Sequence, residues 1–438
     1  MATPPKRKTC KTCIDISLMK DRANIAKSHS LKGPKDSTQT YISALNTGQK
    51  WATTSLTYYF VTTDDTTTVD DGHTETIRNW TDTQKDAMRA AVQAWEDVSA
   101  LTFSEDGATY ATADIKFYLI DDGSYPYLGH AYFPGSANKG QNYVAYSSAD
   151  DTDFPVGSYD WITMIHELGH TLGLAHPHDD GGSSTLFPGV SSSSDLGRNL
   201  QNQTVYTVMS YNDLNGPLTP DVVQSYGFVG GPMAYDVATI QAIYGAPSSL
   251  EGGDTTYTLP TSNEEGTFHK AIVDTGGTDT IDGSSATAGV TIDLRAATVD
   301  GSRRGGGKIS GMSGIEGGFT IAKGTTIERA IGSDHADTLV DHGGDATLEG
   351  GGGNDRIVLH GGDDVVRGGE GTDTVVLPGR RKNYKIIRFP DRWVFKGKGR
   401  KWRRRAGINT LYTFERIKWK RQGKAIPKRK IKPNRRVG

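Results

Sequence analysis

The sequence predicts an α+β domain, then an all-β parallel β-roll, then a basic and β-rich tail. Strands and amphipathic helices alternate up to about residue 248, and a glycine-rich nonapeptide repeat runs from Gly332 to Val376. Basic residues then crowd the C-terminal end. We therefore expect four parts: an N-terminal arm or pro-segment (1–40), a mixed domain (41–248), a roll (249–378) and a basic module (379–438).

The elements of the mixed domain follow from local patterns. Residues 55–61 and 114–120 alternate in the manner of half-buried strands. A capping box at Thr81 and Gln84 starts a helix whose apolar positions recur up to Val98. A second helix begins near Tyr159 and must stop near Gly173, and residues 234–244 form a third.

Charge is distributed very unevenly along the chain. The net charge is −2, yet 24 of the 49 basic residues and only two of the 51 acidic residues lie between Arg380 and Gly438. The tail therefore carries +22 and the rest of the chain −24. We expect the tail either to fold as a cap with a charged face or to meet an anionic partner.

Two cysteines, Cys10 and Cys13, are the only ones in the sequence, so no disulfide framework holds the body together. A second CxxC pair is missing, which excludes a zinc ribbon. We interpret the pair as arm thiols without a special role; a thiolate that inhibits a precursor is the alternative. The N-terminus has no apolar run typical of a signal peptide, and no stretch is long enough to span a membrane.

The segment His166-Glu-Leu-Gly-His170-Thr-Leu-Gly-Leu-Ala-His176 carries the chemistry. His166 and His170 lie one helical turn apart on one face, and Gly173 lets the chain turn back so that His176 becomes a third ligand. Three neutral imidazoles leave an open position for water, as in a catalytic zinc site. Glu167 is offset from that face, where it can act as general base on the water. The alternative is that these are three unrelated surface histidines. It is a poor explanation, because Gly173 and His176 also stand at the positions that a third metal ligand requires.

These residues resemble the long motif of the metzincin metallopeptidases. Val208-Met209-Ser210-Tyr211 is similar to the family's Met-turn, whose methionine lies beneath the zinc and whose tyrosine is a further zinc ligand that supports the oxyanion. The resemblance therefore implies that Met209 packs below the metal and that Tyr211 is both a zinc ligand and a catalytic residue.

Within the metzincins the likeness is to the serralysins. It rests on Pro177 after the third histidine, on the entry at 44–51 and on the exit at 240–245. The resemblance implies a secreted, monomeric zinc endopeptidase that acts on protein or peptide substrates and leaves the cell without an N-terminal signal peptide. The C-terminal residues Asn434–Gly438 depart from the family's usual ending, which bears on the export route. A non-catalytic calcium-binding adhesion or surface protein with a relic zinc site is the alternative. The remaining histidines are interpreted as ordinary surface or packing residues: His29, His73, His130, His178 and His269.

Five unbroken nonapeptides of the form G-G-x-G-x-D-x-U-x, the RTX type, lie between Gly332 and Val376. Glycines permit positive φ at the turns, and the turn carbonyls and aspartates are hard oxygen ligands for Ca²⁺. Successive nonapeptides fall on opposite sides of a roll, so candidate ligands stack every eighteen residues. The predicted calcium ligands are Asp279, Asp282, Asp337, Gly351, Gly353, Asp355, Asp364, Gly369, Gly371 and Asp373.

The two columns of aspartates differ. One column keeps Asp337, Asp355 and Asp373, whereas the other has Ala346 in place of an aspartate before Asp364. We expect calcium between turns 350–355 and 368–373 and between 332–337 and 350–355, and a defective opposite column. Asp279 and Asp282 lie in a segment that resembles the opening of the serralysin roll, and 409–417 resembles the module that follows such repeats. Calcium would let a weakly hydrophobic domain fold after export.

Overall fold

The computed structural model describes residues 38–66, 76–121, 129–135, 141–146, 153–213, 225–247, 252–421 and 424–425. The chain forms two compact units. The first comprises residues up to 250 with 263–273 and 297–307, and the second comprises 251–262, 274–296 and 308–438. The predicted boundaries at 40, 248 and 378 stay predictions. Most of the predicted arm lies outside the described residues, as do Cys10, Cys13, His29 and His73.

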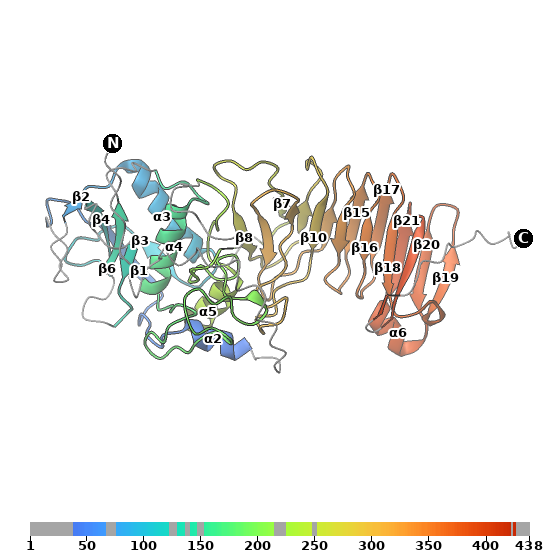
Figure 1. Ribbon diagram of the computed structural model, residues 1–438, viewed down its shortest axis with the longest axis horizontal. Coiled ribbons are helices and arrows are strands. Elements are labelled where there is room, and N and C mark those ends of the chain that lie inside the picture. The colour runs from blue at the N-terminus through green and yellow to red at the C-terminus, as the bar shows by residue number, and fades with distance from the viewer. Residues whose placement is uncertain are drawn as a thin grey trace, which may run out of the picture. The chain divides into compact units, whose positions relative to one another are not determined.

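The first unit contains a six-stranded sheet in the order β3-β1-β4-β6-β5, with β2 also pairing with β4 (Figure 1). β1, β3, β4 and β6 run parallel, whereas β5 pairs antiparallel with β6. The strands are β1 (Ser55–Phe60), β2 (Ile77–Arg78), β3 (Thr102–Ser104), β4 (Ile115–Asp121), β5 (Gly129–Ala131) and β6 (Gln141–Tyr146). β1 and β4 are the two strands that alternation predicted.

Helices complete this unit: α2 (Thr38–Leu45), α3 (Asp82–Glu96), α4 (Tyr159–Thr171) and α5 (Ala234–Tyr244), with a short 3-10 turn η2 (Arg198–Leu200) and strand β8 (His269–Ile272). The last three helices confirm the predicted ones, and α3 has the predicted capping box at Thr81 and Gln84. α4 packs against α3, β5 and β6. The indole of Trp95 in α3 is fully buried and donates to the carbonyl of Ile165 in α4 at 3.1 Å, which fixes the position of the motif helix. α2 was not predicted.

The second unit is a parallel β-roll whose coils place their strands alternately in two sheets (Figure 1). One sheet has the order β11-β10-β14-β16-β18-β22-β23, and the other has β19-β20-β21-β17-β15-β13-β9-β7. The strands are β7 (Thr256–Thr258), β9 (Thr280–Asp282), β10 (Val290–Asp293), β11 (Gly311–Met312), β12 (Gly318–Ile321), β13 (Arg329–Ile331), β14 (Thr338–Val340), β15 (Thr347–Gly351), β16 (Arg356–Val358), β17 (Val365–Gly369) and β18 (Thr374–Pro378).

Coils of the roll stack with the predicted eighteen-residue register. Leu339 pairs with Ile357, which pairs with Val375, and Leu348 pairs with Val366 on the other side. These five side chains are completely buried. The eighth position of each nonapeptide therefore builds the core, which burial of apolar surface stabilises.

The tail continues the roll with one more coil. β21 (Ile408–Tyr412) extends the sheet of β17, and β22 (Arg416–Arg421) extends that of β18. β19 (Tyr384–Arg388) and β20 (Trp393–Gly397) form a hairpin beside β21, and β23 (Lys424–Ala425) pairs with β22. A short turn η3 (Arg381–Asn383) and helix α6 (Gly399–Ala406) lie between these strands. The sequence predicted a β-rich tail but not α6. Among the described residues no helix is sufficiently long and apolar to cross a bilayer.

Candidate active site

Helix α4 positions the first two histidines and the glutamate. Ser158 caps its N-terminus, because its hydroxyl accepts from the backbone N–H of Trp161 at 3.0 Å. At the other end Gly173 has φ +98°, and any Cβ there would collide with the carbonyl of Gln49. The chain can therefore leave the helix sharply and bring His176 back toward it.

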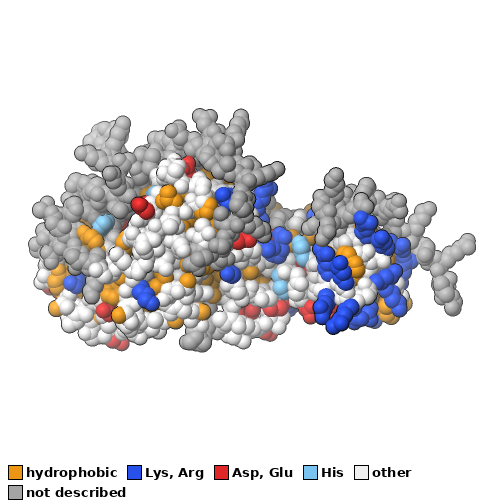
Figure 2. Space-filling view, turned by 90° about the horizontal axis from the view of Figure 1, so that it is seen from below, with side chains coloured by type: hydrophobic (Ala, Val, Ile, Leu, Met, Phe, Trp, Pro, Cys, Tyr) orange, Lys and Arg blue, Asp and Glu red, His pale blue; other side chains and the backbone are white. Residues whose placement is uncertain are grey.

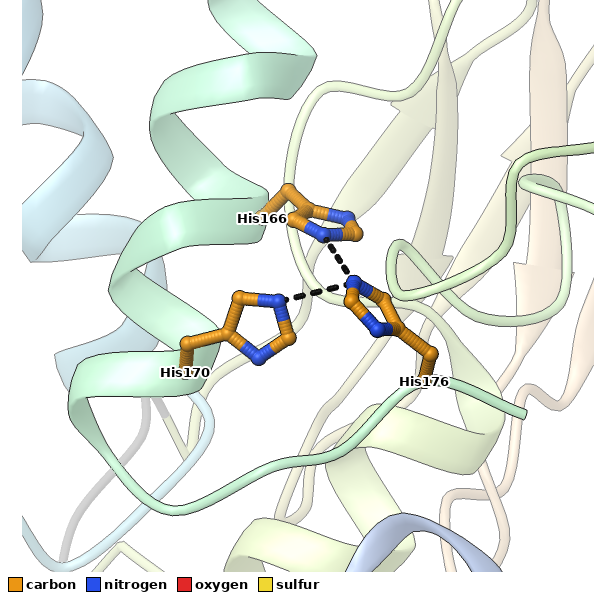
Figure 3. A group of neighbouring side chains, drawn as sticks. All are labelled: His166, His170 and His176. Carbon is orange, nitrogen blue, oxygen red and sulfur yellow. Dashed lines mark hydrogen bonds between the residues drawn. The ribbon is translucent and has the colours of Figure 1, made fainter. Parts of the chain in front are cut away.

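Three imidazoles meet at one point beside α4 (Figure 3). Nε2 of His176 lies 3.0 Å from Nε2 of His166 and 2.9 Å from Nε2 of His170. All three side chains are buried. The motif spacing predicted this convergence, and the three nitrogens are close enough to share one metal ion.

The other ring nitrogen of each histidine is occupied. Nδ1 of His166 donates to the carbonyl of Val208 at 2.8 Å, and Nδ1 of His170 donates to the carbonyl of Leu174 at 2.8 Å. Nδ1 of His176 donates to the carboxylate of Asp179 at 2.5 Å. A neutral imidazole that carries its proton on Nδ1 has a bare lone pair on Nε2. The geometry therefore points three lone pairs at one place.

Burial keeps these imidazoles neutral. It lowers the pKa of His170 to about 3 and holds the pKa values of His166 and His176 well below their usual value, with repulsion among the rings acting in the same direction. Protons are thus disfavoured where three lone pairs converge, whereas a divalent cation would satisfy all three. The donor set, three neutral imidazoles, fits zinc with an open fourth position.

Glu167 lies on α4 beside the histidines and is 1% exposed. A Cβ built on Gly129 of strand β5 would lie 2.6 Å from Cγ of Glu167 and 3.0 Å from its Oε1. Only glycine at position 129 therefore leaves room for this carboxylate. Strand β5 and helix α4 together hold the glutamate in place.

Tyr211 and Met209 close the site from the other side. The hydroxyl of Tyr211 lies 3.0 Å from Nε2 of His176, at the point where the imidazoles meet. Met209 is completely buried, and a Cβ on Gly169 of α4 would lie 2.7 Å from its sulfur. The structure thus brings together all the residues that the sequence predicted for the metal site.

One residue next to the motif was missed. Asp179 orients His176, and it could have been found as a carboxylate three residues after the last histidine. His178, interpreted from the sequence as an ordinary histidine, places its ring 4.6 Å from that of Tyr211 and 4.9 Å from that of His176. His130 lies on β5, where its ring contacts that of Tyr132.

Asp236 on α5 was also missed, and nothing in the local motif indicates it. It is completely buried, and its carboxylate accepts from the hydroxyl of Thr207 at 2.6 Å and from the backbone N–H groups of Val208 and Met233 at 2.7 and 2.8 Å. Burial raises the pKa of Asp236 to about 7, although the three hydrogen bonds act to lower it. Because Val208 also accepts from His166, Asp236 fixes the turn that orients this histidine.

Comparison with known proteins agrees with this arrangement. Residues 50–210 match the matrixin family of peptidases, and residues 234–413 match the serralysin C-terminal domain of the M10 peptidases. The chain belongs to the serralysin-like metallopeptidases. Metallopeptidases of this family carry zinc, which agrees with the three histidines.

Curated relatives are similar to this chain over more than half of its length. Serralysin of Photorhabdus laumondii is 32% identical over 305 residues, covering 63% of this chain and 57% of the relative. Serralysin of Photorhabdus luminescens is 33% identical over 305 residues (63% and 56%), and that of Proteus mirabilis is 32% identical over 289 residues (60% and 54%). The matched region thus spans little more than half the length of these relatives.

In the roll of this serralysin-like chain, position-six carboxylates form hydrogen-bonded ladders. Oδ1 of Asp373 accepts from the N–H of Asp355 at 3.0 Å, and Oδ1 of Asp355 accepts from the N–H of Asp337 at 2.9 Å. On the other side Oδ1 of Asp364 accepts from the N–H of Ala346 at 3.2 Å. In each of these steps, therefore, one carboxylate oxygen accepts the backbone hydrogen bond and the second oxygen takes no part in the ladder.

The remaining oxygens are candidates for cation binding. Oδ2 of Asp355, Asp364 and Asp373 is buried and has no hydrogen-bond partner among the described residues. Burial raises the pKa of Asp355 to about 7 and that of Asp364 to about 9, and raises the pKa of Asp373 as well. A buried anionic oxygen without a donor is costly, and a hard cation such as Ca²⁺ would remove that cost.

Glycines let the coils approach closely at these turns. Gly351, Gly353, Gly369 and Gly371 all have positive φ, between +94° and +114°. A Cβ on Gly369 or Gly371 would collide with the carbonyl oxygen of Gly351 or Gly353 in the coil before. The predicted turn geometry is therefore present at all four glycines.

The other three predicted ligands have different surroundings. Asp337 has both oxygens engaged, since Oδ1 accepts from the N–H of Val290 at 2.7 Å and Oδ2 from that of Ser333 at 2.6 Å. Oδ1 of Asp279 accepts from the N–H of Thr255 at 2.9 Å. Oδ1 of Asp282 accepts from the N–H of Ser284 at 2.8 Å, which stabilises a turn.

Both ladders end in residues that are not aspartates. Asn409 accepts from the N–H of Asp364 at 3.2 Å, and Glu415 accepts from the N–H of Asp373 at 2.6 Å. These residues stand outside the nonapeptide period, so the repeat pattern could not identify them. They terminate the ladders in the last coil of the roll.

Proposed function

We propose that this chain is a secreted zinc endopeptidase that hydrolyses peptide bonds in proteins and is stabilised by calcium. The observation that carries the proposal is the convergence of three imidazoles, in which Nε2 of His176 lies 3.0 Å from that of His166 and 2.9 Å from that of His170 while every Nδ1 donates elsewhere. Secretion and activity on protein substrates are proposed from the family. The zinc ligands would be His166, His170 and His176, with Tyr211 as a further ligand.

Zinc bound there would polarise the scissile carbonyl and make a water molecule more acidic. Glu167 would take the proton of that water and later deliver it to the nitrogen of the leaving amine. Its burial on the helix that carries His166 and His170 supports this role, because the carboxylate is held inside the site and away from bulk water. The Tyr211 hydroxyl, 3.0 Å from His176, would donate to the oxyanion that develops on the substrate carbonyl.

Calcium would be held by the roll. The Oδ2 atoms of Asp355 and Asp373 in one column and of Asp364 in the other support this proposal. Turn carbonyls near Gly351, Gly353, Gly369 and Gly371 would complete the oxygen ligands. Asp337, Asp279 and Asp282 remain proposed ligands, although each already accepts backbone hydrogen bonds.

Metal removal tests the activity. Purified protein should contain about one zinc per chain and cleave casein. Treatment with 1,10-phenanthroline should abolish cleavage, and added zinc should restore it while added calcium alone should not. If the protein binds zinc and calcium but leaves casein and unfolded protein substrates intact, the adhesion or surface protein with a relic site is the better interpretation.

A further inference from the structure

Helix α6 presents cations on its outer face. Five of its eight residues are Lys or Arg, and all five are exposed. Its inner face is anchored, since Ala406 is fully buried and the ring of Trp402 lies so close to Gly379 that a Cβ there would approach it to 2.6 Å. The helix is therefore a positioned element of the roll's last coil that holds its charges outward.

More basic residues adjoin this helix. The backbone N–H of Lys398, just before α6, donates to the carbonyl of Asn383 in η3 at 2.7 Å, so η3 lies against the start of the helix. Figure 2 shows Lys and Arg side chains gathered in this part of the second unit. We name this set the basic cap, and all its members are exposed: Arg380, Arg381, Lys382, Lys398, Arg400, Lys401, Arg403, Arg404 and Arg405.

The basic cap lacks counter-charges within the described part of the chain. None of its nine residues forms an ion pair there. The two acidic residues of the module are used elsewhere, because Asp391 pairs with Arg392 at 3.0 Å and Glu415 accepts from a backbone N–H. No acidic residue of this module is therefore left to pair with the basic cap, and a counter-charge must come from outside the module.

A purely structural cap does not explain this charge. Arg400 and Arg404, and Lys401 and Arg405, are like-charge pairs four residues apart on a helix, which destabilise it. The arginines of the last turn gain only partial compensation from the helix dipole. Neutral side chains at these positions would make the helix and the last coil more stable. The positive charge is therefore better explained by a ligand than by folding.

The side-chain types favour a phosphate polymer. Six of the nine cap residues are arginines, whose planar forks match phosphate oxygens. The β19–β20 hairpin, whose open end adjoins η3 and α6, carries aromatic rings beside arginines at its turn: Arg388 lies 4.1 Å from the ring centroid of Trp393, and Arg392 lies 4.4 Å from that of Phe389, which is 40% exposed. Exposed rings among cations can stack with bases. Phe389 is the one exposed large hydrophobic residue among the described residues of this unit. A single exposed hydrophobic side chain offers little apolar surface for insertion into a membrane.

We propose that the basic cap binds single-stranded nucleic acid. The arginines and lysines of α6 and η3 contact its phosphates, and Phe389 on the hairpin offers a stacking surface for a base. This binding is separate from the peptidase site and does not depend on it.

Two full-length variants test the proposal. The cap variant carries R400Q, K401Q, R403Q, R404Q and R405Q. The matched control loses the same five charges at exposed positions elsewhere: K50Q, K270Q, R303Q, K323Q and R356Q. Binding of a fluorescent 20-nucleotide DNA is followed by anisotropy over a salt series, with calcium present and casein cleavage measured in parallel.

We expect the wild-type chain to bind the DNA and the cap variant to bind at least tenfold more weakly, with the control within twofold of wild type. The slope of log K against log salt should fall by about 3.5 in the cap variant, at about 0.7 for each lost phosphate contact. F389A should weaken binding of single-stranded but not of double-stranded DNA.

Equal losses in the cap variant and the control would overturn the proposal, because only net charge would then matter. Absence of binding by the wild-type chain would also overturn it, and so would preference for vesicles rich in phosphatidylserine or for a sulfated polysaccharide over DNA. Casein cleavage is expected to be the same in all variants. A failure of the nucleic-acid proposal would therefore leave the peptidase proposal untouched, and a failure of the peptidase proposal would leave the nucleic-acid proposal untouched.

Discussion

Asp179 lies at hydrogen-bond distance from His176, with 2.5 Å between Oδ2 and Nδ1. His176 is the histidine that the chain must return to the helix after Gly173, and its Nε2 is the one atom within about 3 Å of both other imidazoles and of Tyr211. A carboxylate behind a metal-ligating histidine fixes its tautomer and increases its basicity. Asp179 thus orients the ligand on which the geometry of the site depends.

Replacement of Asp179 by asparagine should therefore weaken zinc binding by about 10- to 100-fold. The amide keeps the shape of the carboxylate but loses its charge. Zinc affinity is measured by competition with a chromogenic chelator. Asp180→Asn is the matched control, because Asp180 is the exposed neighbour and forms no ion pair with a histidine among the described residues. An equal loss in both variants would contradict the role of Asp179.

Asp236→Asn should destabilise the first unit by about 2–4 kcal/mol and also weaken zinc binding. An asparagine in the same position retains one acceptor oxygen for three donors, and it loses the negative charge that the two backbone N–H groups and the Thr207 hydroxyl now stabilise. Urea unfolding measures the stability, with Asp82→Asn in the first turn of α3 as a control. A variant with unchanged stability and zinc affinity would show that the turn at Val208 holds without this carboxylate.

Without calcium the roll should lose stability as pH rises. The pKa values of Asp355 and Asp364, about 7 and about 9, exceed the value of about 4 of an unfolded aspartate. The folded roll therefore binds more protons than the unfolded chain between about pH 4 and pH 9. As pH rises through this range, the free energy of unfolding falls, because the folded state must give up protons that the unfolded state has already lost. We expect the unfolding free energy in EDTA to fall by several kcal/mol from pH 5 to pH 8, at about 1.4 kcal/mol per pH unit for each carboxyl group that is protonated only in the folded roll.

Excess calcium should remove or reverse this trend, because metal binding requires deprotonated carboxylates. Asp364→Asn should reduce the slope in EDTA, because it removes the group with the higher pKa. The calcium-sensitive unfolding transition of the full chain is the readout. A metal-free roll that becomes more stable toward pH 8 would contradict the assigned burial of these carboxylates.

Gly371→Ala should disrupt the packing of neighbouring coils. Gly371 has φ +114°, and a Cβ would meet the carbonyl of Gly353. A strained backbone together with a collision costs about 2 kcal/mol or more. Gly253→Ala is the control, because that glycine lies in the same unit and a Cβ there meets nothing within 4 Å. Equal melting temperatures of the two variants in calcium would show that the coils can separate without loss.

The parts of the structure that the sequence predicted are those that local pattern specifies. The capping box at Thr81 starts α3, and the nonapeptide period places Leu339 above Ile357, since each depends on residues at fixed spacing. The HExxH spacing likewise brings His166 and His170 to one face of α4.

Residues that act through tertiary contacts were not predictable in this way. Asp236 reaches the turn at Val208 across 28 positions, and Asn409 accepts from Asp364 across 45 positions. Helix α6 has so many charges that its pattern carried no apolar period, and its packing through Trp402 and Ala406 fixes it. Asp179 was missed as well, although it lies only three residues after His176, because its contact with that histidine depends on how the chain turns there.

The proposed peptidase mechanism depends most directly on Glu167 as the general base beside the three histidines. The decisive measurement is zinc content and casein cleavage of Glu167→Ala beside the wild-type chain. We predict about one zinc per chain in both proteins and a loss of cleavage by at least 1,000-fold in the variant, on the order of the contribution of general-base catalysis. Undiminished cleavage by the zinc-loaded variant would contradict the mechanism.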